Sequence, residues 1–178
     1  MHILTEVILV NENDEQIGTI EKMEAHQKGL LHRAFSIFIF NNKGELLLQQ
    51  RASGKYHNGG LWTNTCCSHP LPGEDVLTAA KRRLHEEMGF VTLLSPAFNF
   101  TYHTSFANGL TEHEYDHVLT GTYDGTIKID EREVSDYCFK SISDIEASLQ
   151  IQPQKYTEWF KIALPRIKTF HEGNFTNL

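Results

Sequence analysis

The sequence predicts a single domain of mixed α/β (α+β) class, in which a mixed sheet is flanked by helices and strands outnumber helices. Its 178 residues are enough to bury one hydrophobic core. Short stretches rich in β-branched and aromatic residues recur along the chain with turn residues between them, as expected for strands. Helical periodicity is sustained only at residues 75–88 and near the C-terminus.

Composition narrows the class of partner and the compartment. The formal charge of −7 disfavours nucleic acid, which requires an excess of Lys and Arg, but it leaves a small phosphorylated ligand possible. The longest apolar run, residues 34–40, is too short for a membrane helix of ~20 residues, and the N-terminus lacks the features of a signal peptide. Three cysteines cannot all pair, and a bridge between the adjacent Cys66 and Cys67 would be strained. We therefore expect reduced thiols in a cytoplasmic protein without membrane insertion.

The expected order of elements starts with an N-terminal hairpin. In the first half we expect a strand at residues 5–10, a turn at 11–15, the end of the hairpin at 18–20, a helical turn at 21–26, a buried strand at 34–40, its return at 46–51, a short strand at 61–65, a loop at 69–73 and a helix at 75–88. Gly89 is placed to end that helix in the left-handed conformation.

The second half is expected to hold further strands and two helices. The strands are expected at residues 98–104, 114–122, 127–129 and 137–139. Ser143 and Glu146 fit a capping box for a short helix, and Pro153 lies near the start of a final helix that runs to about Phe170. Residues 173–178 are expected to form a loose tail.

Three histidines and two glutamates are candidate ligands of a metal ion. They are His26, His32, His69, Glu112 and Glu114. Imidazole together with carboxylate suits Zn²⁺, Mn²⁺ or Fe²⁺ better than Ca²⁺. Glu112 and Glu114 are two residues apart, so on a strand they share a face. The alternative is that the glutamates face solvent and the histidines are unrelated, and spacing alone does not bring the three parts of the chain together.

The segment at residues 60–89, GLWTNTCCSHPLPGEDVLTAAKRRLHEEMG, concentrates titratable groups. Its charged helix is open to a plain interpretation as ion pairs four residues apart on a solvated face, worth ~0.3–0.5 kcal/mol each. Aligned on Gly89, however, the segment follows the Nudix motif except at two positions. Ser68 stands where Gly is expected, and Arg83 stands where a metal-binding Glu is expected. A guanidinium there should weaken cation binding and strengthen the grip on phosphate oxygens, so this helix would hold a diphosphate without cutting it.

Cys67 lies two residues before His69, beside the start of the helix. A thiolate could be stabilised in such a place. A thiol at the end of a strand is also often inert packing, which is our interpretation of Cys66. The pattern alone leaves both interpretations of Cys67 open.

Residues 4–159 resemble the type 1 isopentenyl-diphosphate isomerases of the Nudix superfamily. The matching pieces are HRAFSIFIFN, LLLQQRA with Lys55, WTNTCCSHP, RRLHEEMG and EHEYDHV. The resemblance implies a Nudix fold with its core at about residues 30–165 and an N-terminal hairpin and lid segment at 1–29. It also implies conversion of isopentenyl diphosphate to dimethylallyl diphosphate by a 1,3-allylic proton shift, in isoprenoid biosynthesis.

The resemblance implies a role for each site residue. Cys67 and Glu114 would be the catalytic pair on opposite faces of the substrate, with Tyr102 able to relay the proton. His26, His32, His69, Glu112 and Glu114 would hold one divalent metal, Mn²⁺ or Zn²⁺, and Glu87 would contact Mg²⁺ bound with the diphosphate. The cations that bind the diphosphate would be Lys22, Arg51, Lys55 and Arg83. The aromatic residue near the alkene would be Trp159. Core packing of the last helix is the alternative for Trp159.

Two other functions compete with the isomerase. One is an ordinary Nudix hydrolase acting on a nucleoside diphosphate derivative, which would release phosphate. The other is a catalytically inactive, diphosphate-binding Nudix domain, which has no need of an acid/base pair. An isomerase of a free small molecule requires no protein partner, so we expect a monomer.

Overall fold

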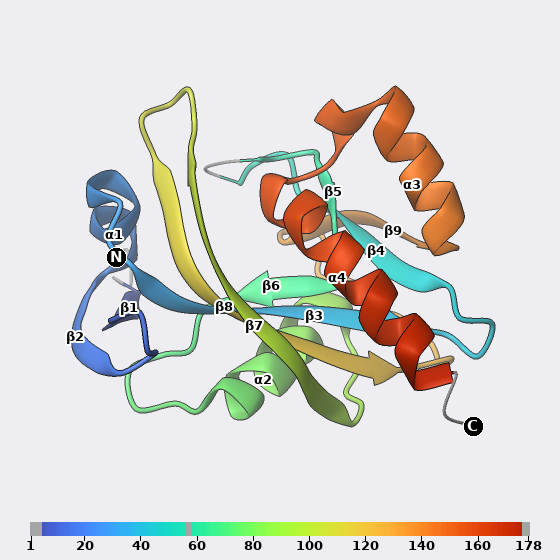
Figure 1. The fold of residues 1–178 in the computed structure, drawn as a ribbon, viewed down its shortest axis with the longest axis horizontal. Helices are drawn as coiled ribbons and strands as arrows, with labels where there is room; N and C mark the ends of the chain where they lie inside the picture. Colours follow the sequence, from blue (N-terminus) through green and yellow to red (C-terminus); the bar gives the residue numbers. More distant parts are fainter. Residues whose placement is uncertain (1–4, 56–57, 176–178) are drawn as a thin grey trace. The chain divides into compact units, whose positions relative to one another are not determined.

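The computed structural model describes residues 5–55 and 58–175 (Figure 1). Within them it has nine strands, four α-helices and one 3₁₀ turn, which confirms the predicted α+β class. None of the helices described is both long and apolar enough to cross a membrane. The chain forms two compact units, which are described separately: the first comprises Met1–Ile37, Cys67–Arg83 and Leu94–Thr120, and the second Phe38–Cys66, Leu84–Leu93 and Gly121–Leu178.

The first unit begins with the predicted hairpin. Its first elements are β1 (Glu6–Val10), β2 (Gln16–Glu21), α1 (Lys22–Lys28) and β3 (His32–Phe40). Strands β1 and β2 are antiparallel, and Leu9 of β1 pairs with His32 of β3. The side chain of Glu21 caps α1 by accepting from Glu24 N at 2.9 Å, and Gly29 ends the helix at φ 63°. The helical turn expected at residues 21–26 is therefore confirmed and extended.

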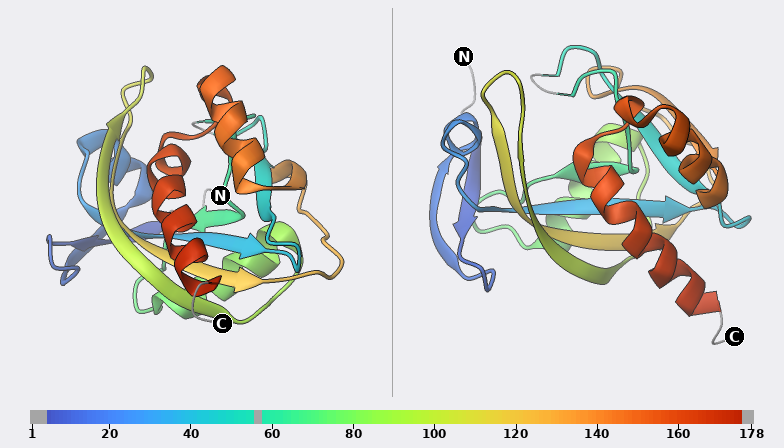
Figure 2. Two further views of the ribbon diagram at one scale, coloured as in Figure 1. Left: turned by 45° about the vertical axis from the view of Figure 1, so that its right-hand side comes forward. Right: turned by 45° about the horizontal axis from the view of Figure 1, so that its top comes forward.

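A long hairpin completes the sheet of the first unit. Strands β7 (Leu94–Ser105) and β8 (Thr111–Thr122) pair with each other, and β8 also pairs with β3 (Figure 2). A tight turn joins them, with a hydrogen bond from Phe106 N to Leu110 O at 2.8 Å. Both strands begin earlier than residues 98 and 114, where the sequence placed them. The earlier start puts Glu112 inside β8 together with Glu114.

The second unit is built around β4. Its strands and helices are β4 (Leu46–Arg51), β5 (Trp62–Thr63), β9 (Val134–Lys140), α3 (Ile142–Ile151), the 3₁₀ turn Pro153–Lys155 and α4 (Glu158–Phe175). Strand β4 pairs antiparallel with β9 along its length and with β5 at its end. Phe38 and Phe160 are fully buried in the core of this unit, with ring centroids 6.3 Å apart.

Helix α2 (Val76–Met88) confirms the helix predicted at residues 75–88. Asp75 accepts a hydrogen bond from Thr78 N at its start, and Glu74 holds Arg82 through two hydrogen bonds of 2.8 and 2.7 Å. At its end Gly89 has φ 75° and donates to His85 O, as predicted for the residue that follows the helix.

Four predictions for the C-terminal half are wrong, and the first two concern the strand at residues 127–129 and the cap of α3 (Ile142–Ile151). No strand forms at residues 127–129, because Lys128 N and Asp130 N donate to Met88 O and Glu87 O at the end of α2. The cap of α3 is Ser141, whose hydroxyl accepts from Asp144 N at 3.1 Å, so Ser143 lies inside the helix.

The final helix is also displaced from the prediction. Pro153 starts a 3₁₀ turn, and α4 begins only at Glu158. It continues to Phe175, so residues 173–175 of the expected loose tail are helical. Residues 176–178 lie outside the described part of the chain.

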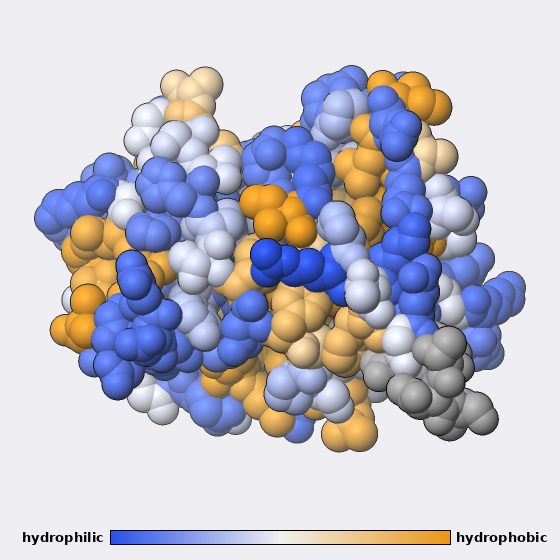
Figure 3. All heavy atoms as spheres, in the orientation of Figure 1, coloured by the Kyte–Doolittle hydropathy of each residue, from blue (hydrophilic) through white to orange (hydrophobic). Residues whose placement is uncertain are grey.

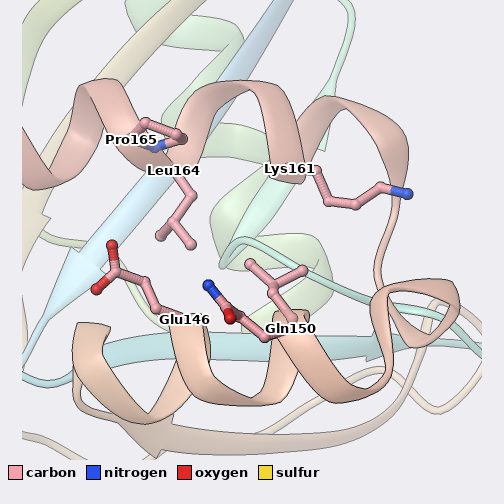
Figure 4. Close-up of a pocket in the computed structure, with 6 residues that line it drawn as sticks. Glu146, Gln150, Lys161, Leu164 and Pro165 are labelled. Carbon is pink, nitrogen blue, oxygen red and sulfur yellow. The ribbon is translucent and has the colours of Figure 1, made fainter.

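A hollow of about 630 Å³ lies between α3 and α4 of the second unit. Figure 3 shows hydrophobic residues in the strip between these helices, and Figure 4 shows Leu164 pointing toward Glu146 and Gln150. The charged residues of its wall are engaged in ion pairs, Glu146 with Lys168 and Lys161 with Glu158. It therefore lacks a convergent set of reactive groups.

Candidate active site and metal centre

Strand β8 carries carboxylates on one face and imidazoles on the other. Glu112, Glu114 and Asp116 are 3, 7 and 1% exposed. The alternate positions, His113 and His117 among them, are half-buried. This alternation follows from the period of two along a strand, and it places Glu112 and Glu114 on one face as predicted.

Four potential metal ligands converge in the first unit. One ligand atom from each of His26, His32, His69 and Glu114 lies within 4.8 Å of all the others. Nε2 of His69 lies 3.2 Å from Nε2 of His32 and 2.9 Å from Oε1 of Glu114. The four side chains come from α1, β3, the residue after β6 (Cys66–Ser68) and β8. The fold thus brings together the separate parts of the chain that spacing alone could not connect.

Backbone carbonyls orient two of these imidazoles. Nδ1 of His32 lies 2.8 Å from Leu30 O, and Nδ1 of His26 lies 3.3 Å from Thr111 O. Because a carbonyl oxygen only accepts, each Nδ1 carries the hydrogen and each Nε2 presents a lone pair. Histidines that bind metals are commonly held in this way.

The electrostatics of the cluster also suit a cation. Burial is the main reason why the pKa of His26 falls to about 4 and that of His69 to about 3, so both rings are neutral near pH 7. Burial alone would raise the pKa of Glu114, but its contacts with His32 and His69 outweigh burial and hold that pKa well below its usual value. Neutral imidazoles beside an ionised carboxylate fit a divalent metal of the Zn²⁺ or Mn²⁺ type.

Tyr102 on β7 contacts both glutamates. Its hydroxyl donates to Oε2 of Glu114 at 2.6 Å and lies 3.1 Å from Oε2 of Glu112. Burial, followed by the charges of Glu112 and Glu114, raises the pKa of Tyr102 well above its usual value. The phenol is therefore held protonated. Glu112 contacts the hydroxyl of Tyr102 and does not belong to the group of four potential metal ligands.

Asp116 is a buried carboxyl that the sequence analysis missed. Ser36 donates to its Oδ2 at 2.7 Å. Burial, then the charge of Glu114, raises the pKa of Asp116 to about 8. The signal was available, because Asp116 continues the alternation that singled out Glu112 and Glu114.

The remaining candidates in the first unit are Cys67, Lys22 and Arg83. Cys67 lies on β6 and is half-buried, whereas Cys66 is fully buried. Cys67 lies two residues before His69, which directly follows β6. Lys22 is the first residue of α1, and its charge helps to lower the pKa of His26 and of His69, as expected for a neighbouring cation. Arg83 lies on α2.

Trp159 is held by polar contacts in the second unit. The indole is 2% exposed, its Nε1–H donates to Oδ1 of Asn64 at 3.2 Å, and the guanidinium of Arg51 lies 5.3 Å from the ring. Asn64 in turn donates to Cys66 O at 2.9 Å. Asn64 had no assigned role in the sequence analysis, although it belongs to the WTN segment that carried the resemblance.

Glu87 and Lys55 also lie in the second unit. Nε2 of Gln49 donates to Oε2 of Glu87 at 2.9 Å and to Thr65 O at 2.7 Å, so the buried carboxylate is fixed in orientation. Lys55 forms an ion pair with Glu133. Gln49 is a third residue that the sequence analysis missed, because nothing in its sequence neighbourhood points to Glu87.

The sequence matches the NUDIX domain family over residues 30–160. It is 52% identical over 170 residues to a protein from Pectobacterium atrosepticum named isopentenyl-diphosphate Delta-isomerase, covering 96% of this chain and 95% of that protein. It is also 44% identical over 173 residues to isopentenyl-diphosphate Delta-isomerase 1 of Aromatoleum aromaticum, covering 97% of this chain and 98% of that protein.

Solved structures show the same fold at low identity. DR0079 from Deinococcus radiodurans superposes with a TM-score of 0.73 at 18% identity, covering 90% of this chain and 98% of that one. The MutT protein from Methanosarcina mazei superposes with a TM-score of 0.65 at 20% identity, covering 81% of this chain and 95% of that one. The fold is therefore that of the Nudix proteins, and the extent and level of the sequence identity place this chain in the isopentenyl-diphosphate Delta-isomerase family.

Proposed function

We propose that this protein converts isopentenyl diphosphate to dimethylallyl diphosphate by adding a proton on one face of the substrate and removing one from the other. The observation that carries the proposal is the identity of about half of all residues, over nearly the whole chain, with proteins that bear this activity in their names. The contacts among Tyr102, Glu114 and His69 support it, because they supply a buried acid/base group at the metal cluster.

The reaction requires an acid for an unactivated alkene, and a base for the proton that is lost afterwards. Glu114 is the group on one face, and it exchanges its proton directly or through the hydroxyl of Tyr102, which lies in hydrogen-bonding contact with it. Cys67 is the group on the other face. Both side chains belong to the first unit.

His26, His32, His69 and Glu114 would hold one divalent metal, Mn²⁺ or Zn²⁺. Glu112, which lies outside this group of four, would have to turn toward the ion to become a further oxygen ligand. Three imidazoles with carboxylate oxygens are a donor set that suits these ions. When bound, the metal supplies positive charge that favours the ionised form of Glu114. The chain's own part is to keep His26 and His69 neutral through burial, and to aim His26 and His32 through the carbonyls of Thr111 and Leu30.

The diphosphate would be held by cations and by Mg²⁺. Glu87, fixed by Gln49, is the proposed contact to Mg²⁺. Arg83 and Lys22 of the first unit, and Arg51 and Lys55 of the second, are the proposed grips on phosphate oxygens. The indole of Trp159 would stabilise the tertiary cation, a contribution of about 2 kcal/mol when desolvated.

Water must be excluded, because it would trap the cation as an alcohol. Residues 22–31, which include α1, are proposed to cover the cluster when the diphosphate binds. The expected result is slower limited proteolysis of this segment with a substrate analogue and Mg²⁺. Equal rates with and without them would contradict the closure.

The test is incubation with isopentenyl diphosphate and Mg²⁺, followed by NMR for the shift of the alkene and by an assay for released phosphate. We expect the allylic product and no phosphate. Phosphate release would identify a Nudix hydrolase. If neither the allylic product nor phosphate forms, the protein is a diphosphate-binding domain without catalytic activity.

Site variants test the catalytic pair. Cys67→Ala and Glu114→Gln should each abolish turnover, whereas Cys138→Ser, which changes a half-buried thiol on β9, should retain it. Full activity in both site variants would refute the assigned pair. Size-exclusion chromatography should show the monomer that we expect.

A further inference from the structure

The face of β8 that carries no carboxylates holds the end of α1. Nδ1 of His113 lies 3.0 Å from Gly29 O, and since the carbonyl only accepts, the imidazole donates. Gly29 ends α1 in the left-handed conformation. A Cβ at Gly29 would lie 3.3 Å from Cγ2 of Thr111, so the chain passes close to β8 at this point.

A second contact fixes the same helix three residues earlier. His26 donates from Nδ1 to Thr111 O at 3.3 Å. Helix α1 is thus tied to β8 at His26 and at Gly29, through residues 111 and 113. All the views in Figures 1 and 2 show α1 lying beside the β7–β8 hairpin.

The ring of His113 is itself held in place. The imidazole of His103, on the neighbouring strand β7, contacts it edge to face with centroids 5.0 Å apart. Helix α1 has seven residues, a length at which a helix is marginal without tertiary contacts. The position of His26 therefore depends on what holds α1 against the sheet.

We propose that His113 is a positioning residue for the metal centre: by donating to Gly29 O it latches α1 onto β8 and so holds His26 among the other ligands. The inference rests on the proposed metal site. It assigns the two faces of one strand to one centre, since Glu114 supplies a ligand from the inner face and His113 secures a ligand from the outer face. Without this hydrogen bond α1 can move away from β8. His26 then no longer lies among the ligands, and only His32 and His69 remain as imidazole ligands.

Three variants separate this role from general packing. His113→Ala removes the donor, and His113→Asn keeps an amide N–H near the position of Nδ1. His117→Ala is the matched control, because His117 lies on the same face of β8 but contacts Asp14 in the β1–β2 turn, at 2.9 Å. The measurement is the dissociation constant of Zn²⁺ or Mn²⁺, by competition with a chromophoric chelator.

We expect His113→Ala to weaken metal binding about tenfold, as is typical when the support of a metal ligand is lost. His113→Asn and His117→Ala should bind as the wild type does. In a His26→Ala background, His113→Ala should have little further effect, because the latch acts through His26. Trypsin should also cleave metal-free His113→Ala faster after Lys22 and Lys28, at either end of α1.

The outcomes distinguish the latch from the metal site on which it rests. Unchanged affinity in His113→Ala, an equal loss in His117→Ala, or a full effect of His113→Ala without His26 would each overturn the latch while leaving the metal centre intact. A wild-type protein that binds neither ion would overturn the proposed metal centre. In that case the rate of trypsin cleavage still decides whether His113 holds α1, and an unchanged rate refutes it.

Discussion

The hydroxyl of Tyr102 lies 2.6 Å from Oε2 of Glu114, and the other oxygen of the same carboxylate lies 2.9 Å from Nε2 of His69. The two oxygens of Glu114 therefore have different neighbours, a proton donor on one side and the imidazole cluster on the other. This division would let one carboxylate serve as a metal ligand and as a group that exchanges a proton.

Tyr102→Phe tests this division. The variant removes the hydroxyl but keeps the ring, so we expect kcat to fall by about a hundredfold or more while metal affinity stays unchanged. Steady-state kinetics and metal titration on the same preparation measure both quantities. A parallel loss of metal binding would mean that Tyr102 supports the cluster and not the proton transfer.

Gln49→Leu should weaken Mg²⁺ activation. Gln49 fixes the carboxylate of Glu87 from the side, and without it the Mg²⁺ concentration for half-maximal activity should rise about tenfold. Gln50→Leu is the control, since Gln50 is the next residue on β4 but donates to Gly60 O instead of to Glu87. Identical Mg²⁺ curves for Gln49→Leu and the wild type would remove Gln49 from this role.

The histidine cluster should make the metal-free protein sensitive to acid. The pKa of His26 in the folded protein, about 4, lies below the usual histidine value of 6.5. Its stabilising contribution is therefore fully present above about pH 6.5 and is lost as the pH falls through about 4, at ~1.4 kcal/mol per pKa unit. His69, with a pKa of about 3, acts in the same direction.

Asp116 acts in the opposite direction, since its folded pKa of about 8 lies above 3.8 and its contribution is lost as the pH rises through about 8. Because Asp116 and His26 act in opposite directions, the test compares two proteins. The urea concentration at the unfolding midpoint is measured as a function of pH for the wild type and for His26→Asn. We expect the variant to lose less stability between about pH 6.5 and about pH 4. A steeper loss in the variant would contradict the assigned neutral state of His26.

Gly89→Ala should destabilise the fold by about 3 kcal/mol or more. Gly89 has φ 75°, and a Cβ there would lie 2.2 Å from Lys128 O, a backbone atom that cannot simply move aside. Gly109 is the matched control, because it has φ 83° with nothing within 4 Å, so alanine there should cost only about 1 kcal/mol of backbone strain. Chemical unfolding gives both free energies. Equal values would show that φ and not the close approach dominates.

Local pattern predicted most of the elements. The hairpin, the buried strand at residues 34–40 and the helix at 75–88 depend on periodicity and turn residues, which are visible in a single sequence. The strand expected at residues 127–129 failed because its N–H groups complete the end of α2, a tertiary contact without a local signal. The cap of α3 was misplaced by two residues because Ser141 and Ser143 both qualify locally.

The sequence predicted which residues belong to the candidate site, but it did not predict how they come together in space. Alternation placed Glu112 and Glu114 on one face, but only the fold brings His26, His32 and His69 to Glu114. The residues that orient these groups were missed for the same reason. Gln49, Asn64 and His113 act through hydrogen bonds to partners distant in sequence, and none of them belongs to a motif that chemistry alone would single out.

Strand β8 alternates carboxylates with the imidazoles that hold the N-terminal segment. Deleting or inserting one residue at its start would exchange these two sets, turning Glu114 outward and an imidazole inward. A two-residue change would preserve the faces but would shift every cross-strand neighbour. The number of residues in the strand between the hairpin turn and Asp116 is therefore fixed more strictly than the side chains themselves.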